Sequence, residues 1–427
     1  MRKKLLIALA ALVVLLLAGA AAAYFALKAD RPEGGLDTEL EGVSLFQDTE
    51  AASEEEEPEE TTIEEAPPET PDGPPPERCW KNFGGNPQRT LALPSVHLGV
   101  PTKQLWRRYM GDVLEYPPTF CDGFLYVNVE HGTTVALNAK NGRVIWKRGH
   151  GGFLASSPAI DGPRLIVSSH AGTVTGLRRS NGKLLWRLRV PGKVESSPVV
   201  VDGIAYFGTT EGRLFAVNSR TGRVRWAYNT GGRMNASPSV FGDRVCNSTY
   251  AGSIICVRKS SGQEIWTTYV SRDALRMESF YASPSTDGRR LFTVARTGKV
   301  VALSALSGKI LWTYHMGALA YSTPAIAEGT IYVSAFDGGI RALRTSNGSE
   351  KWTRFVPGRI LASALVVGDL VFVSTLEKRT YGLRRSNGQV VWTLKRGKYA
   401  PGIATDRRYY FSANGSVIVY RGRQGPK

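Results

Sequence analysis

The stretch "SSPVVVDGIAYFGTTEGRLFAVNSRTGRVRW", from Ser196 to Trp226, decides the fold of this chain. The segments "PVVV", "IAYFGT", "RLFAV" and "RVRW" have the β-branched, aromatic or alternating composition of β-strands. The pairs "DG", "EG" and "TG" separate them, and Gly in such pairs supplies the positive φ of a tight turn. The stretch therefore predicts four short antiparallel strands, a to d, joined by three tight turns.

The same unit recurs along the chain, and tryptophan marks its period. Eight Trp residues follow one another every 40 residues, except for 46 residues between the fifth and the sixth. They are Trp106, Trp146, Trp186, Trp226, Trp266, Trp312, Trp352 and Trp392. Repeated four-strand units of this length are typical of β-propeller blades. We interpret the Trp residues as structural side chains that pack between neighbouring blades.

The two ends of the repeat indicate how the ring closes. Seven complete units end at Trp146 through Trp392. "KQLWRRYM" supplies one strand before them, and "GIATDRRYYFSANGSVIVYRGRQ" supplies three strands after them. The sequence predicts an all-β, eight-bladed propeller in which the N-terminal strand completes the last blade, so that no sheet edge stays open.

The N-terminal region differs in composition from the repeats. Leu5 to Leu27 is an uncharged apolar run, long enough for a single transmembrane helix. Arg2, Lys3 and Lys4 precede it, which places the N-terminal stub in the cytoplasm and the propeller outside. A cleaved signal peptide is the alternative, because Ala18 to Ala23 offers A-x-A sites. The predicted parts are the stub and helix (1–28), a disordered acidic Pro/Glu-rich linker (29–78) and the propeller (79–427).

Charge is distributed unevenly between these parts. The chain has 427 residues and a net charge of +17, but residues 29–77 hold 18 acidic residues and one basic residue. Residues 78–427 hold 49 basic and 19 acidic residues, a net charge of +30. Such a domain attracts polyanions. The acidic linker is expected to be a solvated spacer, and the alternative is that it folds back and competes with the partner of the propeller.

Several phrases resemble one known family. "ALNAKNGRVIW" (Ala136 to Trp146) is similar to the repeat of the PQQ-like (quinoprotein-like) propellers. So are the lead-in "WKNFGGNPQRT" and the openings Ser157-Pro158, Ser197-Pro198, Ser237-Pro238 and Ser283-Pro284. The resemblance covers about residues 79–427 and implies the propeller fold more strongly than any one activity.

The family contains enzymes and binding proteins. Its quinone (PQQ)-dependent dehydrogenases place a vicinal Cys-Cys disulfide over the quinone, and its propeller lipoproteins of outer-membrane protein assembly (BamB-like) carry a lipidated Cys. This chain has neither feature, and no Glu, Asn and Asp set matches the calcium and quinone ligands. We expect a non-enzymatic, BamB-like protein without a cofactor, and keep the dehydrogenase as the alternative.

Arginine replaces the Asp that is usual in this family eight residues before the repeat Trp. The substituted positions are Arg178, Arg258, Arg344 and Arg384, with Arg421 at the equivalent place in the last blade. The c–d turns carry them to one face of the ring. A solvated surface is one interpretation, and binding of phospholipid headgroups, wall polyanions or an envelope protein is the other. Nucleic acid is disfavoured by the predicted location at the cell membrane.

Two features of the opposite face stand out. The loop from Thr268 to Ala282 holds the six extra residues, and Leu275, Met277, Phe280 and Tyr281 make it a candidate partner-binding protrusion. His131 and His170 lie in b–c turns without the fixed spacing of a metal site, so we interpret them as exposed turn residues. No metal or catalytic site is predicted.

The four cysteines suit an exported protein, in which disulfides persist. Cys246 and Cys256 flank the turn "STYAGS" and face each other if that hairpin has a three-residue loop. Buried free thiols are the alternative. Cys79 and Cys121 are a second candidate pair, which would tie the lead-in to the first blade.

Overall fold

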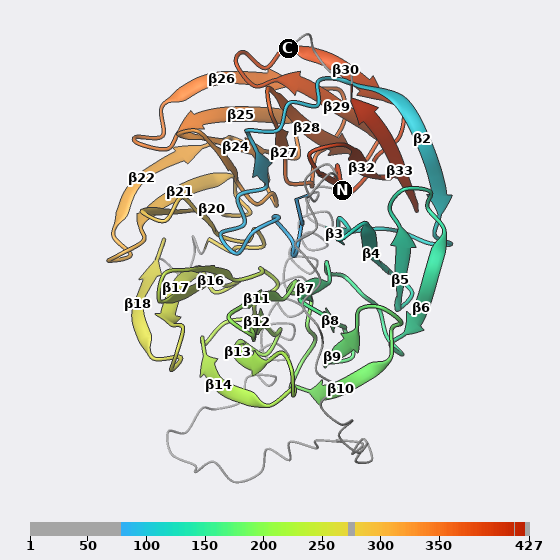
Figure 1. Cartoon of the computed structure of the whole chain (residues 1–427). Helices are drawn as coiled ribbons and strands as arrows, with labels where there is room; N and C mark the ends of the chain where they lie inside the picture. The colour runs from blue at the N-terminus through green and yellow to red at the C-terminus, as the bar shows by residue number, and fades with distance from the viewer. Residues whose placement is uncertain (1–77, 272–277, 414, 423–427) are drawn as a thin grey trace, which may run out of the picture. The chain divides into compact units, whose positions relative to one another are not determined.

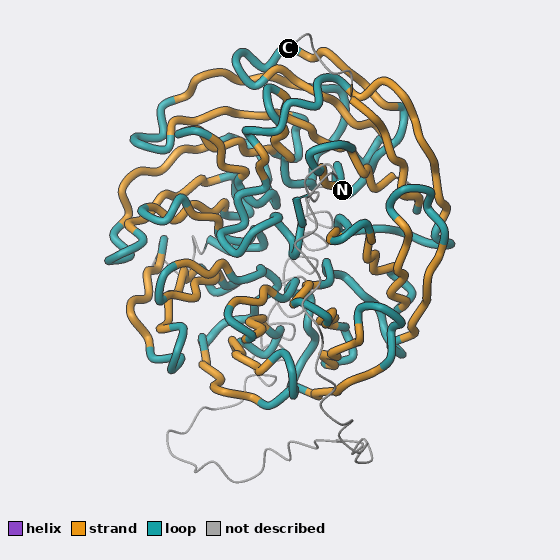
Figure 2. Tube along the Cα trace, viewed as in Figure 1, coloured by secondary structure: helices purple, strands orange, loops and turns teal. Residues whose placement is uncertain are grey.

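The structure is a computed structural model that describes residues 78–271, 278–413 and 415–422. The predicted N-terminal helix and acidic linker lie outside these residues. In the described part of the chain, no helix has the length and apolar character needed to cross a membrane. Strands joined by loops make up this part, as Figure 2 shows.

Eight sheets are arranged in a ring, and each runs from an inner strand a to an outer strand d (Figure 1). The first four blades are β3 to β6 (Thr119–Cys121, Phe124–Val129, Thr133–Asn138, Val144–Gly149), β7 to β10 (Ala159–Asp161, Arg164–Ser168, Thr173–Arg178, Leu184–Arg189), β11 to β14 (Val199–Val201, Ile204–Gly208, Arg213–Asn218, Val224–Asn229) and β15 to β18 (Ser239–Phe241, Arg244–Ser248, Ser253–Arg258, Glu264–Tyr269).

Blades 5 to 7 follow the same pattern. They are β19 to β22 (Ser285–Thr286, Arg290–Val294, Lys299–Ser304, Ile310–His315), β23 to β26 (Ala325–Ala327, Thr330–Ser334, Gly339–Arg344, Glu350–Phe355) and β27 to β30 (Leu365–Val367, Leu370–Thr375, Arg379–Arg384, Val390–Leu394). Blade 8 joins β31 to β33 (Ile403–Ala404, Tyr409–Ala413, Ser416–Gly422) with β2 (Pro101–Tyr109) from the N-terminal side.

Strand β2 closes the ring as predicted. It pairs antiparallel with β33, and Trp106 lies opposite Val419 just as Trp146 lies opposite Ala136 in blade 1. The prediction of eight four-stranded blades is confirmed. Every described strand lies within residues 92–422, so a fragment of residues 78–427 contains the whole hydrogen-bonded ring.

Each repeat Trp joins its blade to the next one. Its indole Nε1 donates a hydrogen bond to a carbonyl oxygen of the following c–d turn in seven of the eight cases, at 2.8–3.3 Å. Its ring lies against the turn Gly of that blade, where a β-carbon would come within 2.5–2.7 Å. The packing role of the Trp residues follows from these contacts.

The lead-in segment, defined here as residues 79–100, crosses the centre of the ring. Its carbonyl oxygens accept hydrogen bonds from inner-strand amides of six blades, and β1 (Ala92–Leu93) pairs in parallel with β27. The acceptors are Trp80, Lys81, Pro87, Gln88, Thr90 and Leu91. The segment therefore satisfies inner-strand amides that would otherwise be buried without a partner.

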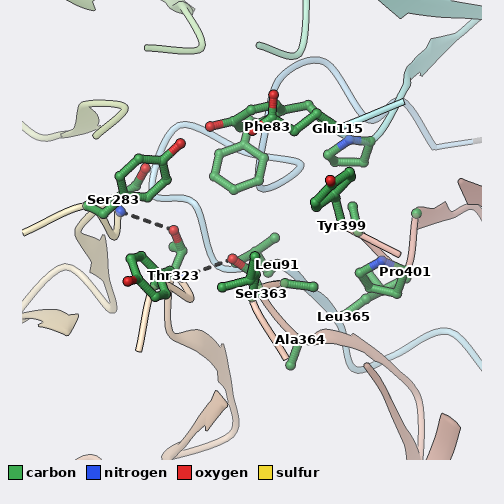
Figure 3. A pocket seen from close by; sticks show the side chains of 18 of the residues that line it. Phe83, Leu91, Glu115, Ser283, Thr323, Ser363, Ala364, Leu365, Tyr399 and Pro401 are labelled. Carbon is green, nitrogen blue, oxygen red and sulfur yellow. Dashed lines mark hydrogen bonds between the residues drawn. The ribbon is translucent and has the colours of Figure 1, made fainter. Parts of the chain in front are cut away.

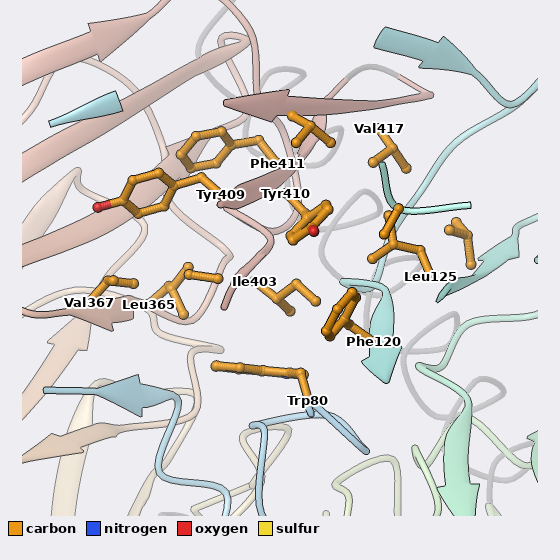
Figure 4. Close-up of a cluster of buried hydrophobic side chains, with 14 of the residues drawn as sticks. Trp80, Phe120, Leu125, Leu365, Val367, Ile403, Tyr409, Tyr410, Phe411 and Val417 are labelled. Carbon is orange, nitrogen blue, oxygen red and sulfur yellow. The ribbon is translucent and has the colours of Figure 1, made fainter. Parts of the chain in front are cut away.

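Aromatic side chains hold this segment to the first and last blades. Trp80 is 2 % exposed and belongs to a cluster with Phe120, Ile403 and Tyr410 (Figure 4). The rings of Phe120 and Tyr410 are stacked with centroids 5.6 Å apart. The lead-in thus forms part of the core.

Both cysteine pairs considered in the sequence are disulfide-bonded in the structure. Cys79 joins Cys121, which fastens the lead-in to β3 of blade 1, with the two Cα atoms 4.4 Å apart. Cys246 and Cys256 are directly opposed on β16 and β17, with Cα atoms 4.1 Å apart. Free cysteines are absent from the described residues.

Candidate functional site

A cavity of about 440 Å³ opens near the centre of the ring (Figure 3). The loops between blades and the b–c turns form its walls, and Phe83 and Leu91 of the lead-in also line it. A volume in this range is typical of small-ligand sites, which are mostly apolar with a few polar groups.

Serine and threonine hydroxyls form a relay that joins blades 2 to 7 beside this cavity. Each lies two residues before an inner strand and accepts a hydrogen bond from the matching backbone amide of the preceding blade, at 2.8–3.1 Å. The accepting hydroxyls are Ser197, Ser237, Ser283, Thr323 and Ser363, and Figure 3 shows the last two bonds. The relay begins at the amide of Ser157, whose own hydroxyl donates to the carbonyl oxygen of Pro117 at 2.8 Å. The "SP" openings of the repeat therefore have a structural role, because they join neighbouring inner strands.

Arg89 of the lead-in binds backbone carbonyl oxygens of this region. Its side chain is fully buried and donates to the carbonyl oxygens of Phe83, Ser197 and Pro238 at 2.6–2.9 Å. Burial lowers the pKa of Arg89 to about 9, which leaves the guanidinium charged at neutral pH. The three carbonyl oxygens compensate for the loss of water around this charge.

Tyrosines dominate the walls of the cavity. Tyr116, Tyr250, Tyr281 and Tyr321 come from different loops, and Tyr281 makes edge contacts with Tyr250 and Tyr321 at centroid distances of 6.3 and 5.9 Å. The phenol of Tyr116 lies close to that of Tyr281. Burial is the main cause that raises the pKa of both phenols well above its ordinary value, so both are neutral donors at physiological pH.

One carboxyl group lines the cavity among the described residues, and it belongs to Glu115. Burial, followed by the charges of Glu130 and Glu195, raises the pKa of Glu115 to about 7. Perturbed carboxyl groups in cavities are candidates for functional groups. Sequence reasoning missed Glu115, because it lies in an irregular loop whose position depends on the closed ring.

The five arginines at the equivalent repeat position, Arg178, Arg258, Arg344, Arg384 and Arg421, all lie exposed on the face formed by the a–b and c–d turns, opposite to the cavity mouth. Of these five, Arg258 alone has a carboxylate partner among the described residues, Asp243 at 3.1 Å. In three of these blades the next residue in the chain is also basic, and it forms an ion pair. Arg179, Lys259 and Arg385 pair at 2.5–2.7 Å with acidic residues in the a–b turn of the preceding blade. The second basic residue therefore joins blades, and the first leaves its charge at the surface.

Blades 1 and 3 have Asn at the repeat position that holds Arg in five other blades. Asn138 and Asn218, at the same repeat position in blades 1 and 3, each accept two backbone amides of the c–d turn through Oδ1, at 2.9–3.3 Å. Arginine has no acceptor and cannot make these bonds. The Arg blades thus give up a local turn contact.

The predicted partner-binding loop needs a correction. Leu275 and Met277 lie outside the described residues. Phe280 is completely buried in the core between blades 4 and 5, so its assignment to a protruding surface is wrong. The six-residue insertion precedes a normal blade start, and an apolar residue there fills the core. Tyr281 belongs to the cavity wall.

The histidines of the b–c turns do not form a metal site in the described structure. The side chain of His131 is 75 % exposed and pairs with Asp112. His170 Nε2 lies 3.9 Å from Glu195 Oε1. The group of potential ligands that lies close enough together among the described residues is Cys79, Cys121 and Asp122, and its two thiols are joined in a disulfide.

The described lining does not fit the quinone of the dehydrogenases. That quinone carries three carboxylates, and its binding needs cationic partners. No Lys or Arg lines the cavity in the part of the chain that the structure describes, whereas Glu115 does. The cysteines pair across 42 and 10 residues, so neither disulfide is vicinal.

Comparison with known proteins agrees on the fold. BamB from Moraxella catarrhalis matches with a TM-score of 0.65 and 15% identity, over 75% of this chain and 99% of that chain. A europium-containing methanol dehydrogenase matches with a TM-score of 0.67 and 13% identity, over 75% and 86%. The quinohemoprotein alcohol dehydrogenase from Comamonas testosteroni matches with a TM-score of 0.66 and 13% identity, over 82% of each chain. At these identities the likeness shows the fold alone.

A search of curated proteins gave no match. A family model described as "Outer membrane protein assembly factor BamB" matches residues 98–275 and 257–423, which span most of the described propeller. Together with the eight blades, the relay of Ser hydroxyls and the blade-joining Trp residues, this match identifies the chain as a member of the BamB-like family of PQQ-like β-propellers.

Proposed function

We propose that this protein is a non-enzymatic binding or scaffold protein of the cell envelope, anchored in the cell membrane by its N-terminal segment. Its propeller holds an anionic surface, lipid headgroups or wall polymer, through the face that carries Arg178, Arg258, Arg344, Arg384 and Arg421. The alternative is a quinone-dependent dehydrogenase.

The exposed, mostly unneutralised charge at one repeat position supports this proposal most strongly. Four of the five arginines lack a carboxylate within ion-pair distance among the described residues. Like charges around a ring repel one another and cost some stability. Arginine also gives up the turn contacts that Asn138 and Asn218 make. A surface that serves solubility alone can mix both signs of charge without either penalty.

A hollow between blades 6 and 7 offers a specific place for an anionic group. Arg344 and Arg384 come from neighbouring blades and border it together with Lys351. Its volume is about 690 Å³, and Glu328, Glu350 and Asp369 also line it. Glu328 is paired with Arg385 at 2.7 Å, and Glu350 accepts a hydrogen bond from Tyr314 at 2.6 Å. Two of the three carboxylates are therefore already engaged.

Cosedimentation tests the proposal. The fragment of residues 78–427 should sediment with vesicles of anionic phospholipid or with anionic wall polymer, and not with phosphatidylcholine vesicles. Binding should weaken as salt rises, because each nearby Lys or Arg contributes roughly 1 kcal/mol at an anionic membrane. The tighter binder of the two, anionic phospholipid or anionic wall polymer, is identified as the ligand of this face.

A second variant with the same change in net charge tests whether binding depends on the arginine face or only on the net charge of the domain. Asp at all five arginine positions should abolish binding and keep the fold, because Asp is the usual family residue there. Asp at five exposed basic residues of the opposite face, Arg189, Lys193, Arg233, Arg296 and Arg379, changes the net charge equally and should leave most binding intact. Equal sedimentation of both variants and of the unchanged fragment would contradict the proposal.

Reconstitution tests the dehydrogenase alternative. Quinone and calcium are added to the purified protein, and the bound quinone absorbance and dye-linked alcohol oxidation are measured. Stoichiometric quinone binding with alcohol-dependent dye reduction would replace the binding function with an enzymatic one.

A further inference from the structure

Three carboxylates converge beside the central cavity of a strongly basic domain. Glu115 lies in the loop between β2 and β3, Glu130 follows β4, and Glu195 lies between β10 and β11. Glu130 and Glu195 are close enough for their charges to act on Glu115. Among the described residues no Lys or Arg forms an ion pair with any of the three, and His170 lies 3.9 Å from Glu195. The buried guanidinium of Arg89 lies over the ring of Phe83 in the lining, 5.5 Å from its centroid, and the three carboxylates outnumber this cation. The cavity therefore keeps a local negative potential within a domain of opposite charge.

An amide oxygen gives a second and independent indication. Asn235 lines the cavity and is 8 % exposed. Its Nδ2 donates to Glu195, which fixes the orientation of the amide because a carboxylate only accepts. Its Oδ1 is buried and has no hydrogen-bond partner. A buried acceptor of this kind is satisfied by a ligand that donates an N–H or O–H.

The aromatic walls narrow the choice of ligand to a cation. The rings of Tyr116, Tyr281 and Tyr321 have electron-rich faces, which attract ammonium groups. Three other rings of the lining, Phe83, Phe336 and Tyr399, already lie under cations of the chain, which are Arg89 at 5.5 Å, Arg359 at 5.6 Å and Lys398 at 4.5 Å. For the three tyrosines, no such contact with a Lys or Arg occurs among the described residues.

We propose that the central cavity binds the ammonium group of an organic amine. Asn235 Oδ1 and the Glu115 carboxylate accept hydrogen bonds from its N–H groups, and the rings of Tyr116, Tyr281 and Tyr321 face the ammonium and the alkyl chain next to it. The unpartnered Asn235 acceptor favours an ammonium that carries N–H over a quaternary one. The amine is either a small molecule or the side chain of a lysine on a partner protein. This site lies on the face opposite to the five arginines and does not depend on their function.

Calorimetric titration of the full chain in a nonionic detergent at pH 8 tests the site. The probes are n-butylammonium, lysine amide with an acetylated α-amine, tetramethylammonium and 1-butanol. Butylammonium should bind, 1-butanol of nearly the same shape should not, and tetramethylammonium should bind more weakly. If the lysine amide with an acetylated α-amine binds at least as tightly as butylammonium, the natural ligand is the lysine side chain of a partner protein. If it binds more weakly, the natural ligand is a small amine.

Variants assign the contacts. Glu115→Gln and Asn235→Ala should each weaken butylammonium binding by about 10- to 100-fold, the loss expected for a hydrogen bond to a charged group. Glu211→Gln removes an exposed carboxylate from a b–c turn of the same face and should leave affinity unchanged. Tyr281→Phe keeps the ring and should keep binding, whereas Tyr281→Leu should weaken it.

Thermal unfolding of each variant checks that the fold is kept. A loss of affinity can then be assigned to the substituted side chain and not to unfolding. Butylammonium and 1-butanol binding equally, or Glu115→Gln and Glu211→Gln having equal affinities, would overturn the proposal. The absence of binding by every cation would overturn it as well.

Discussion

The indole ring of Trp146 lies against Gly182 of the next blade, so closely that a β-carbon on Gly182 would come within 2.6 Å of the ring. The same Trp donates from Nε1 to the carbonyl oxygen of Arg179 at 2.9 Å. Gly182 is therefore required twice, once by its positive φ of 73° and once by the space that the indole occupies. This relationship recurs between neighbouring blades and makes the spacing of Trp and Gly a signature of the ring.

The first prediction concerns this contact. Gly182→Ala should lower the free energy of unfolding by about 2–4 kcal/mol, because left-handed strain and overpacking add. Gly162→Ala is the matched control, since Gly162 also has a positive φ, of 51°, but nothing lies within 4 Å of its added β-carbon. The control should lose about 1–2 kcal/mol. Urea unfolding followed by Trp fluorescence measures both, and equal losses would show that the indole contact contributes nothing.

The second prediction concerns the buried guanidinium of Arg89. Arg89→Met leaves three buried carbonyl oxygens without a donor and should lower the free energy of unfolding by about 3–5 kcal/mol. Arg78→Met is the control, because the side chain of Arg78 is 52 % exposed and its pair with Asp406 is 3.8 Å long. That change should stay within about 0.5 kcal/mol. A similar unfolding midpoint for the two variants would be incompatible with a supporting role for Arg89.

The third prediction concerns the pH dependence of stability at Glu115. The raised pKa means that the folded protein binds the proton more tightly than the unfolded chain between pH 4.5 and about 7. The free energy of unfolding therefore falls as pH rises through this window and is constant in this respect above it. Burial and the charges of Glu130 and Glu195 cause the shift, and the phenols of Tyr116 and Tyr281 remain neutral throughout.

Glu115→Gln isolates this effect, because glutamine does not ionise. Its stability relative to the unchanged protein should increase by about 2–3 kcal/mol from pH 5 to pH 8. Glu211→Gln, at an exposed position, should show no such increase. Urea titrations at four pH values decide the matter, and parallel curves for all three proteins would refute the raised pKa.

The fourth prediction concerns the two disulfides. Replacing Cys79 and Cys121 with Ala opens a loop of 42 residues, and replacing Cys246 and Cys256 opens one of 10 residues. The chain-entropy relation gives losses of about 4 and about 3 kcal/mol. Loss of the first disulfide should also make the lead-in accessible to protease, whereas loss of the second should not. Peptide mapping without reductant that finds four free thiols would contradict both bridges.

The fifth prediction concerns topology. A protease specific for Glu, added to intact spheroplasts, should cut within residues 29–77 and release the propeller, because the basic residues before the apolar run favour an exterior location. Cleavage only after lysis would place the propeller in the cytoplasm. A cytoplasmic marker protein that stays uncut serves as the control for integrity.

Much of the architecture could be read from local signals. The Gly of each c–d turn, the alternating strands and the Trp period are repeated seven times, so errors in one blade are corrected by the others. The closure by Trp106 followed from counting incomplete units, and Arg421 lies at the position equivalent to Asn138, as expected from the spacing. The burial of Phe280 was not predictable in this way, because the six-residue insertion leaves open at which residue the regular blade pattern begins again.

The sequence by itself determined the all-β repeat, the number of blades, the closing strand and the uneven charge, because each depends on local patterns of turns, strands and period. Tertiary structure decided the rest. The path of the lead-in across the ring, the burial of Arg89 and the convergence of Glu115, Asn235 and four tyrosines join loops that lie up to about 200 residues apart. No local pattern marks these residues, since each is ordinary in its own loop. Only closure of the ring removes water from them and brings their charges and rings together.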